Sequence, residues 1–217
     1  MILFLLFSIP LASLLYLKVY FSNSFHSSET WLVFFRGVIS FFISVLPIYI
    51  IIRSYPWSYS SPAMYLRSFF LDFLVLVIPL LLFFLLWEKR RIKYEYGQRL
   101  FTHIFAFCSG FFALSGVFYG FVYFGHYSGY RLFGFPLLII MLLLFTVVSL
   151  YLYSINMEWD RYLYIAVPIA AGLLFSIVPL LLGLSYPKSG FILCVFYPAV
   201  SSAVIYLLQM KRIIPGK

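Results

Sequence analysis

The chain has 217 residues, of which 65% are hydrophobic and 10% are charged, with a mean hydropathy of +1.05. Soluble domains carry about 25% charged residues, and a soluble fold of this length could not bury so much apolar surface. The net charge of +9 does not indicate nucleic-acid binding. The Lys and Arg residues stand between apolar runs, where they orient membrane helices.

Seven apolar segments follow one another along the chain. They cover residues 1–17, 31–52, 69–87, 100–124, 132–155, 162–183 and 190–210, with approximate ends. Each is near the roughly 20 residues that a helix needs to cross a bilayer. Continuous apolar runs favour helices over the alternating pattern of a membrane barrel. The sequence therefore predicts an all-α integral membrane protein: one polytopic domain over residues 1–217, a bundle of seven transmembrane helices.

The basic residues predict the orientation of the bundle. We expect the first segment to be a retained helix rather than a signal peptide, because no Lys or Arg precedes Lys18. With the loop KRRIKYEYGQR in the cytoplasm, eleven basic residues lie inside: Lys18, Arg36, Lys89, Arg90, Arg91, Lys93, Arg99, Arg161, Lys211, Arg212 and Lys217. Four lie outside: Arg53, Arg67, Arg131 and Lys188. This asymmetry predicts an outer N-terminus and a cytoplasmic C-terminus in a plasma or bacterial inner membrane.

The basic loop itself is a candidate site. Its basic residues, Lys89, Arg90, Arg91, Lys93 and Arg99, could bind anionic lipid or a cytoplasmic partner, although their role in topology is sufficient to explain them. Glu95, Arg99 and His103 recur at four-residue spacing and share one helical face. This spacing predicts that the fourth helix extends beyond the membrane, and it leaves a proton relay at His103 as an alternative.

Small residues mark one face of the fourth segment. They are Ala106, Gly110, Gly116 and Gly120, and the last two form a GxxxG motif. Such spacing lets two helix backbones approach closely. We expect this helix to be the packing centre of the bundle, with its partner either in this chain or in another subunit.

A few ionisable residues lie near the predicted outer face. Asp72 stands inside an apolar run, and ionisable groups within membrane spans are costly. If it converged with His126, Arg53, Arg67 and Arg131, these residues would form an outer polar mouth able to hold a phosphate or carboxylate. The alternative is that they are separate anchors at helix ends.

Motifs for the common enzyme classes are missing from the sequence. It contains no HExxH, CxxC, GxSxG or Walker loop, so no metal site and no cofactor is predicted. The leading hypothesis is a permease-like or complex-forming membrane subunit that handles lipid or another hydrophobic substrate. One alternative is an intramembrane enzyme acting on lipid headgroups at the outer leaflet, with Asp72 and His126 as acid and base. A second alternative is a seven-helix receptor or sensor. The expected partners are membrane lipids and other membrane protein subunits, and nucleic acid is not expected.

Overall fold

Helices form every element in the described part of the protein. The computed structural model describes residues 27–53, 69–92, 97–122, 129–156 and 162–166, together with single residues or pairs elsewhere. The elements are α2 (Ser27–Arg53), the π-helix η2 (Phe69–Leu74), α4 (Val75–Phe83), the π-helix η3 (Phe84–Glu88), α5 (Lys89–Arg91), α6 (Gly97–Val122) and α7 (Gly129–Ile155). No strand occurs within these ranges. The prediction of an all-helical chain is confirmed for this part.

The second, fourth and fifth predicted segments coincide with α2, α6 and α7 to within a few residues. Residues 162–166, at the start of the sixth segment, are helical. The first segment, the seventh and the remainder of the sixth lie outside the described residues apart from isolated positions. One described helix segment, Glu29–Ile48, is long and apolar enough to cross a membrane, and Ile139–Ile155 is a shorter apolar helix. Crossing by seven segments therefore stays a prediction.

The third predicted segment differs from a plain α-helix. It divides into η2, α4 and η3, and the chain continues through the short helix α5. Pro79 lies inside α4 and removes one backbone N–H donor from the ladder. A π-helical turn accommodates an extra residue per turn and is frequent near functional sites. At the end of η3, Trp87 is exposed and the next side chain, Glu88, is buried.

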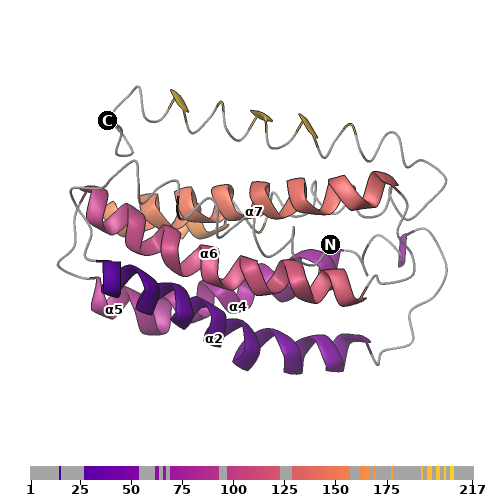
Figure 1. Ribbon diagram of the computed structural model, residues 1–217, viewed down its shortest axis with the longest axis horizontal. Coiled ribbons are helices and arrows are strands. Elements are labelled where there is room, and N and C mark those ends of the chain that lie inside the picture. The colour runs from indigo at the N-terminus through magenta and orange to yellow at the C-terminus, as the bar shows by residue number, and fades with distance from the viewer. Residues whose placement is uncertain are drawn as a thin grey trace.

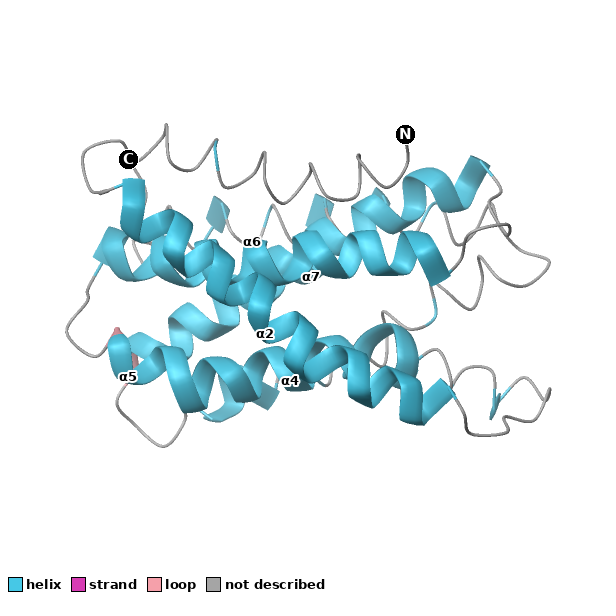
Figure 2. Cartoon of the chain, turned by 60° about the horizontal axis from the view of Figure 1, so that its bottom comes forward, coloured by secondary structure: helices cyan, strands magenta, loops and turns pink. Residues whose placement is uncertain are grey.

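Helix α6 lies between α2 and α7 (Figure 1), and the second view shows the same helices running side by side (Figure 2). Two glycines allow the close approach of α2 and α6. A Cβ on Gly37 would overlap the carbonyl oxygen of Phe107, and a Cβ on Gly110 would overlap that of Phe34. On the other side of α6, Phe101 meets Tyr151 of α7 edge to face, with ring centroids 5.4 Å apart.

Phenylalanine side chains fill the core between these helices. Phe41 of α2 packs against Phe111 of α6, with ring centroids 5.4 Å apart and a T-shaped arrangement. Phe84 of η3 meets Phe107 of α6 at 6.2 Å. All four rings are buried, and such aromatic pairs contribute beyond the area they bury. These contacts hold α2 and η3 against α6.

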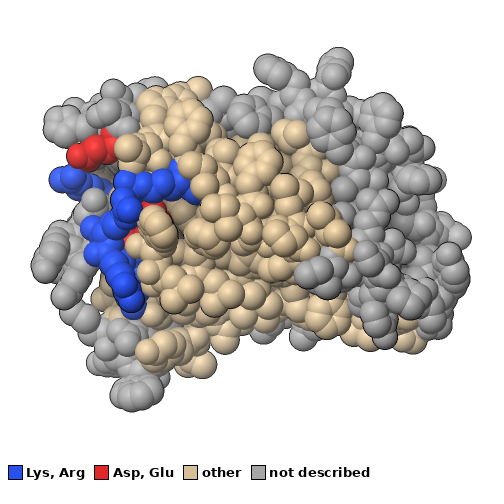
Figure 3. Space-filling model, turned by 90° about the horizontal axis from the view of Figure 1, so that it is seen from below, with Lys and Arg blue, Asp and Glu red and all other residues tan. Residues whose placement is uncertain are grey.

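One end of the bundle carries most of the described charged side chains. We call it the basic end and define it by Lys89, Arg90, Arg91 and Arg99. Figure 3 shows Lys and Arg gathered there with acidic side chains beside them, whereas the remaining described surface on that face carries no charged side chain. Two contacts join helix ends at this place: Arg99 pairs with Glu29 at 3.1 Å, and the Lys89 ammonium lies 2.7 Å from the Tyr153 hydroxyl.

Candidate functional site

Glu88 is the centre of a charged cluster inside a bundle whose described core is mostly apolar. Its side chain is 1% exposed, at the last position of η3. The Oε2 atom lies 3.4 Å from Nη1 of Arg36 on α2 and 3.0 Å from Nε2 of His103 on α6. Three helices thus direct one ionisable group each toward the same point. A buried carboxylate is costly unless it is paired and hydrogen-bonded, so these two partners explain how Glu88 can be buried.

The second oxygen of Glu88 has no such partner. Oε1 is buried and makes no hydrogen bond within the described part of the chain. A buried acceptor left unsatisfied costs about 1–3 kcal/mol, and more when the group is charged. An unpaired oxygen of this kind calls for an explanation, and a donor supplied by a bound molecule would provide one.

A pocket of about 180 Å³ opens beside this cluster. Its charged lining residues are Arg36, Glu88 and Arg91, and its apolar lining includes Ile39, Ile43, Phe83 and Phe107. Ser40 also lines the pocket, but its hydroxyl is taken up by the Gly37 carbonyl at 2.7 Å. The pocket therefore has both charged and apolar lining residues, a combination that suits an amphiphilic ligand.

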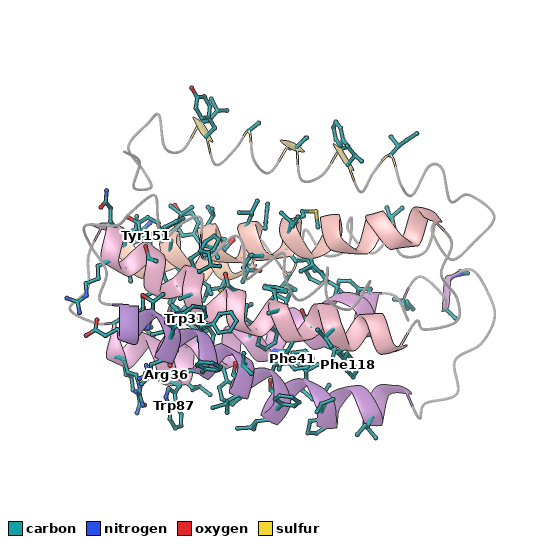
Figure 4. All side chains as sticks on the ribbon, viewed as in Figure 1. Trp31, Arg36, Phe41, Trp87, Phe118 and Tyr151 are labelled. Atoms are coloured by element: carbon teal, nitrogen blue, oxygen red, sulfur yellow. The ribbon has the colours of Figure 1, made fainter. Side chains whose placement is uncertain are left out.

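Trp87 and Arg91 form the rim of the pocket. The Arg91 guanidinium lies 5.5 Å from the centroid of the Trp87 ring, a cation–π contact. Trp87 is 56% exposed, and Figure 4 shows Trp87 and Arg36 at the same end of the bundle. A tryptophan beside an arginine is typical of the membrane–water interface, where the ring is half in apolar surroundings.

The cluster can bind anions and can hold a proton. A guanidinium has five N–H donors in a fork that matches phosphate and carboxylate, so Arg36 can contact Glu88 and still donate to a ligand. Nε2 of His103 and Oε2 of Glu88 lie 3.0 Å apart, so a proton can be shared between the imidazole ring and the carboxylate. Within the described residues no group of three or more His, Cys, Asp and Glu side chains could hold a metal ion.

The predicted basic loop is found at the basic end. Lys89, Arg90 and Arg91 form α5, Arg99 lies in the first turn of α6, and Lys93 and Glu95 lie outside the described residues. Among the four described members of this set, Arg91 lines the pocket. His103, predicted to share a helical face with Arg99 and considered as a proton relay, contacts Glu88.

The residues of the predicted outer polar mouth are not brought together by any described contact. Arg53 ends α2, Asp72 belongs to η2 and Arg131 to α7, but their side chains lie outside the described part of the structure. His126 and Arg67 also lie outside it. The acid–base pair of Asp72 and His126 therefore stays a prediction.

The small residues of the fourth segment all lie in α6. Gly110 contacts the Phe34 backbone of α2, and Ala106 is fully buried. The surroundings of Gly116 and Gly120 lie outside the described part. At Gly110 the close partner is therefore a helix of this same chain.

Sequence reasoning missed Glu88 and treated Arg36 as a flanking charge. Glu88 directly precedes the run Lys89–Arg91, so it resembled the start of a loop. The available signal was Arg36, which stands within the predicted segment 31–52 and there requires a partner. No known protein family, no curated protein and no solved structure matches this chain.

Proposed function

We propose that the chain is a multi-pass membrane protein of seven helices, with its basic end in the cytoplasm, and that it acts as a permease-like or complex-forming subunit. In this proposal it handles lipid or another hydrophobic molecule. The observation that carries the proposal is the pocket between α2 and η3, which combines Arg36 and Arg91 with apolar side chains.

The surface of α2 supports the membrane part of the proposal. Its inner face is buried at Phe34, Phe41 and Val45. Its outer face exposes another apolar row: Leu32, Phe35, Ile39, Phe42 and Ile43. A helix that is hydrophobic all round belongs in a protein core or in a membrane, and large exposed apolar surfaces mark sites of membrane or partner contact.

The position of the pocket supports the handling of an amphiphile. Ile39 and Ile43 belong to both the pocket lining and the exposed row of α2. The pocket is therefore continuous with the surface that would face lipid, and its charged side lies toward the basic end. A lipid molecule could enter from the bilayer without passing its tail through water.

Photolabelling tests this proposal directly. The purified chain, in bilayer nanodiscs, would be exposed to an anionic lipid that carries a photoreactive group in its acyl chain, and the labelled peptides would be identified by mass spectrometry. We expect labelling to concentrate on residues 36–43 and 83–91. Ile43→Trp should fill the pocket opening and reduce this labelling.

Phe42→Trp is the matched control. Phe42 adjoins Ile43 and is similarly exposed, but it does not line the pocket. This variant should label as the parent chain does. Labelling spread evenly over all exposed apolar helices, or equally reduced by both substitutions, would contradict the proposed function.

A further inference from the structure

We propose that the pocket beside Glu88 binds a phospholipid with one negative charge and a hydroxyl-bearing headgroup, of the phosphatidylglycerol type. This inference rests on the proposed function and specifies its ligand. It follows from three features of the site: its balance of charge, the unpaired oxygen of Glu88, and the direction in which the apolar lining runs.

The charged lining residues favour a monoanionic headgroup. Two guanidinium groups, Arg36 and Arg91, and one carboxylate, Glu88, line the pocket. With Glu88 counted as a carboxylate, one positive charge is left for a ligand to neutralise. Arginine forks bind phosphate oxygens in a bidentate manner. A phosphodiester fits both conditions, whereas a zwitterionic headgroup would leave the positive charge unbalanced.

The second oxygen of Glu88 accepts no hydrogen bond within the described part of the chain, and a donor on the ligand would satisfy it. Oε2 already contacts Arg36 and His103, and Oε1 is buried without a partner in the described part of the chain. A carboxylate only accepts hydrogen bonds. A headgroup glycerol supplies hydroxyl donors next to the phosphate, while an ionised fatty acid has none. Phosphatidic acid lacks this glycerol and carries more negative charge than the pocket can balance.

The apolar lining runs away from the charged side in the direction a lipid tail would take. Arg36, Ile39 and Ile43 are spaced three and four residues apart, so they share one face of α2. Ile43 lies about 10 Å farther from the basic end than Arg36, from the helix rise of 1.5 Å per residue. The headgroup would thus lie near Arg36 and Arg91, and an acyl chain would follow Ile39 and Ile43 toward the middle of the bundle.

Competition against the photoreactive lipid tests the headgroup. Unlabelled phosphatidylglycerol should suppress pocket labelling at roughly a tenfold lower mole fraction than phosphatidylcholine or phosphatidic acid, because one additional charge-assisted hydrogen bond corresponds to about a factor of ten in affinity. The water-soluble headgroup, glycerophosphoglycerol, should not suppress it. Suppression by this compound would show that the ligand is a soluble phosphate ester and would overturn the proposal.

Two variants assign the effect to particular residues. Glu88→Gln keeps the shape of the side chain and removes its charge, so the preference for phosphatidylglycerol over phosphatidic acid should disappear. Arg91→Gln should reduce the preference for anionic lipid, whereas Arg90→Gln, next to it but outside the pocket lining, should not. If Glu88→Gln does not fold, the competition on the parent chain and the Arg91 and Arg90 pair still decide the question.

The outcomes separate this inference from the proposed function. Pocket labelling that all lipids suppress equally, and that neither Glu88→Gln nor Arg91→Gln changes, would refute the headgroup assignment and leave the proposed function standing. Labelling absent from the pocket would refute both. Cross-linking of residues 36–43 to a second chain, with no effect of added lipid, would show that protein covers the pocket and would also overturn the inference.

Discussion

Replacing Gly110 with alanine should push α2 and α6 apart. A Cβ at this position overlaps the backbone of Phe34, which cannot rotate away as a flexible side chain could. Forcing a methyl group into a packed core costs about 1–3 kcal/mol, while the change from glycine to alanine inside a helix gains about 0.5–1 kcal/mol. We expect a net loss of about 1–2 kcal/mol, which lowers the Tm of a chain of this length by roughly 2–8 °C.

The measurement is thermal unfolding in mild detergent, followed by tryptophan fluorescence. Gly37→Ala should cause a similar loss, because its Cβ overlaps the Phe107 carbonyl on the opposite helix. The double variant should lose less than the sum of the two, since one separation of the helices relieves both overlaps. Strictly additive losses, or a Gly110→Ala chain as stable as the parent, would refute this account of the α2–α6 contact.

Four further predictions follow, the first three measured by the same thermal unfolding and the last in cell membranes. Ser109→Ala removes a buried hydroxyl that has no partner in the described part, so the free energy of unfolding should stay equal or rise by up to about 1 kcal/mol; a loss matching that of Gly110→Ala would contradict it. Arg36→Leu should cost about 1–3 kcal/mol, below the value for a fully buried pair because Arg36 is 26% exposed. Adding Glu88→Leu to Arg36→Leu should recover most of that loss. In the separate, exposed pair of Arg99 and Glu29, Arg99→Gln should lower the free energy of unfolding by at most about 0.5 kcal/mol. A reporter enzyme active only in the cytoplasm should work when inserted after Lys93 and fail when inserted after Ser128, and the reverse result would overturn the predicted orientation.

Hydropathy was sufficient to locate the described helices but not their internal geometry. Long apolar runs have few alternatives to a helix in a membrane, and the predicted segments therefore match α2, α6 and α7 closely. The π-helical turns around α4 could not be predicted, because they depend on how Pro79 and its neighbours pack against other helices.

The contact between α2 and α6 could also be predicted only in part. The small residues of the fourth segment indicated a face of close approach, and Gly110 lies against α2. Gly37, which makes the complementary contact, was not predicted, because it is a single glycine without a small residue four positions away. Motifs of the GxxxG type describe one helix at a time, whereas the contact depends on which residues of the second helix face it.

The cluster of Arg36, Glu88 and His103 could be predicted from the sequence only in part. Arg36 and Glu88 are 52 residues apart, and no local pattern relates them. Arg36 nevertheless stands inside a predicted membrane segment, where a charge needs a partner, and the whole chain offers only six acidic residues. Five of them, Glu29, Glu88, Glu95, Glu158 and Asp160, lie on the predicted cytoplasmic side, and Asp72 lies near the predicted outer face. The sequence therefore leaves five candidate partners for Arg36. The structure identifies Glu88 as the partner, adds His103 as a third member of the cluster and places an apolar pocket beside them.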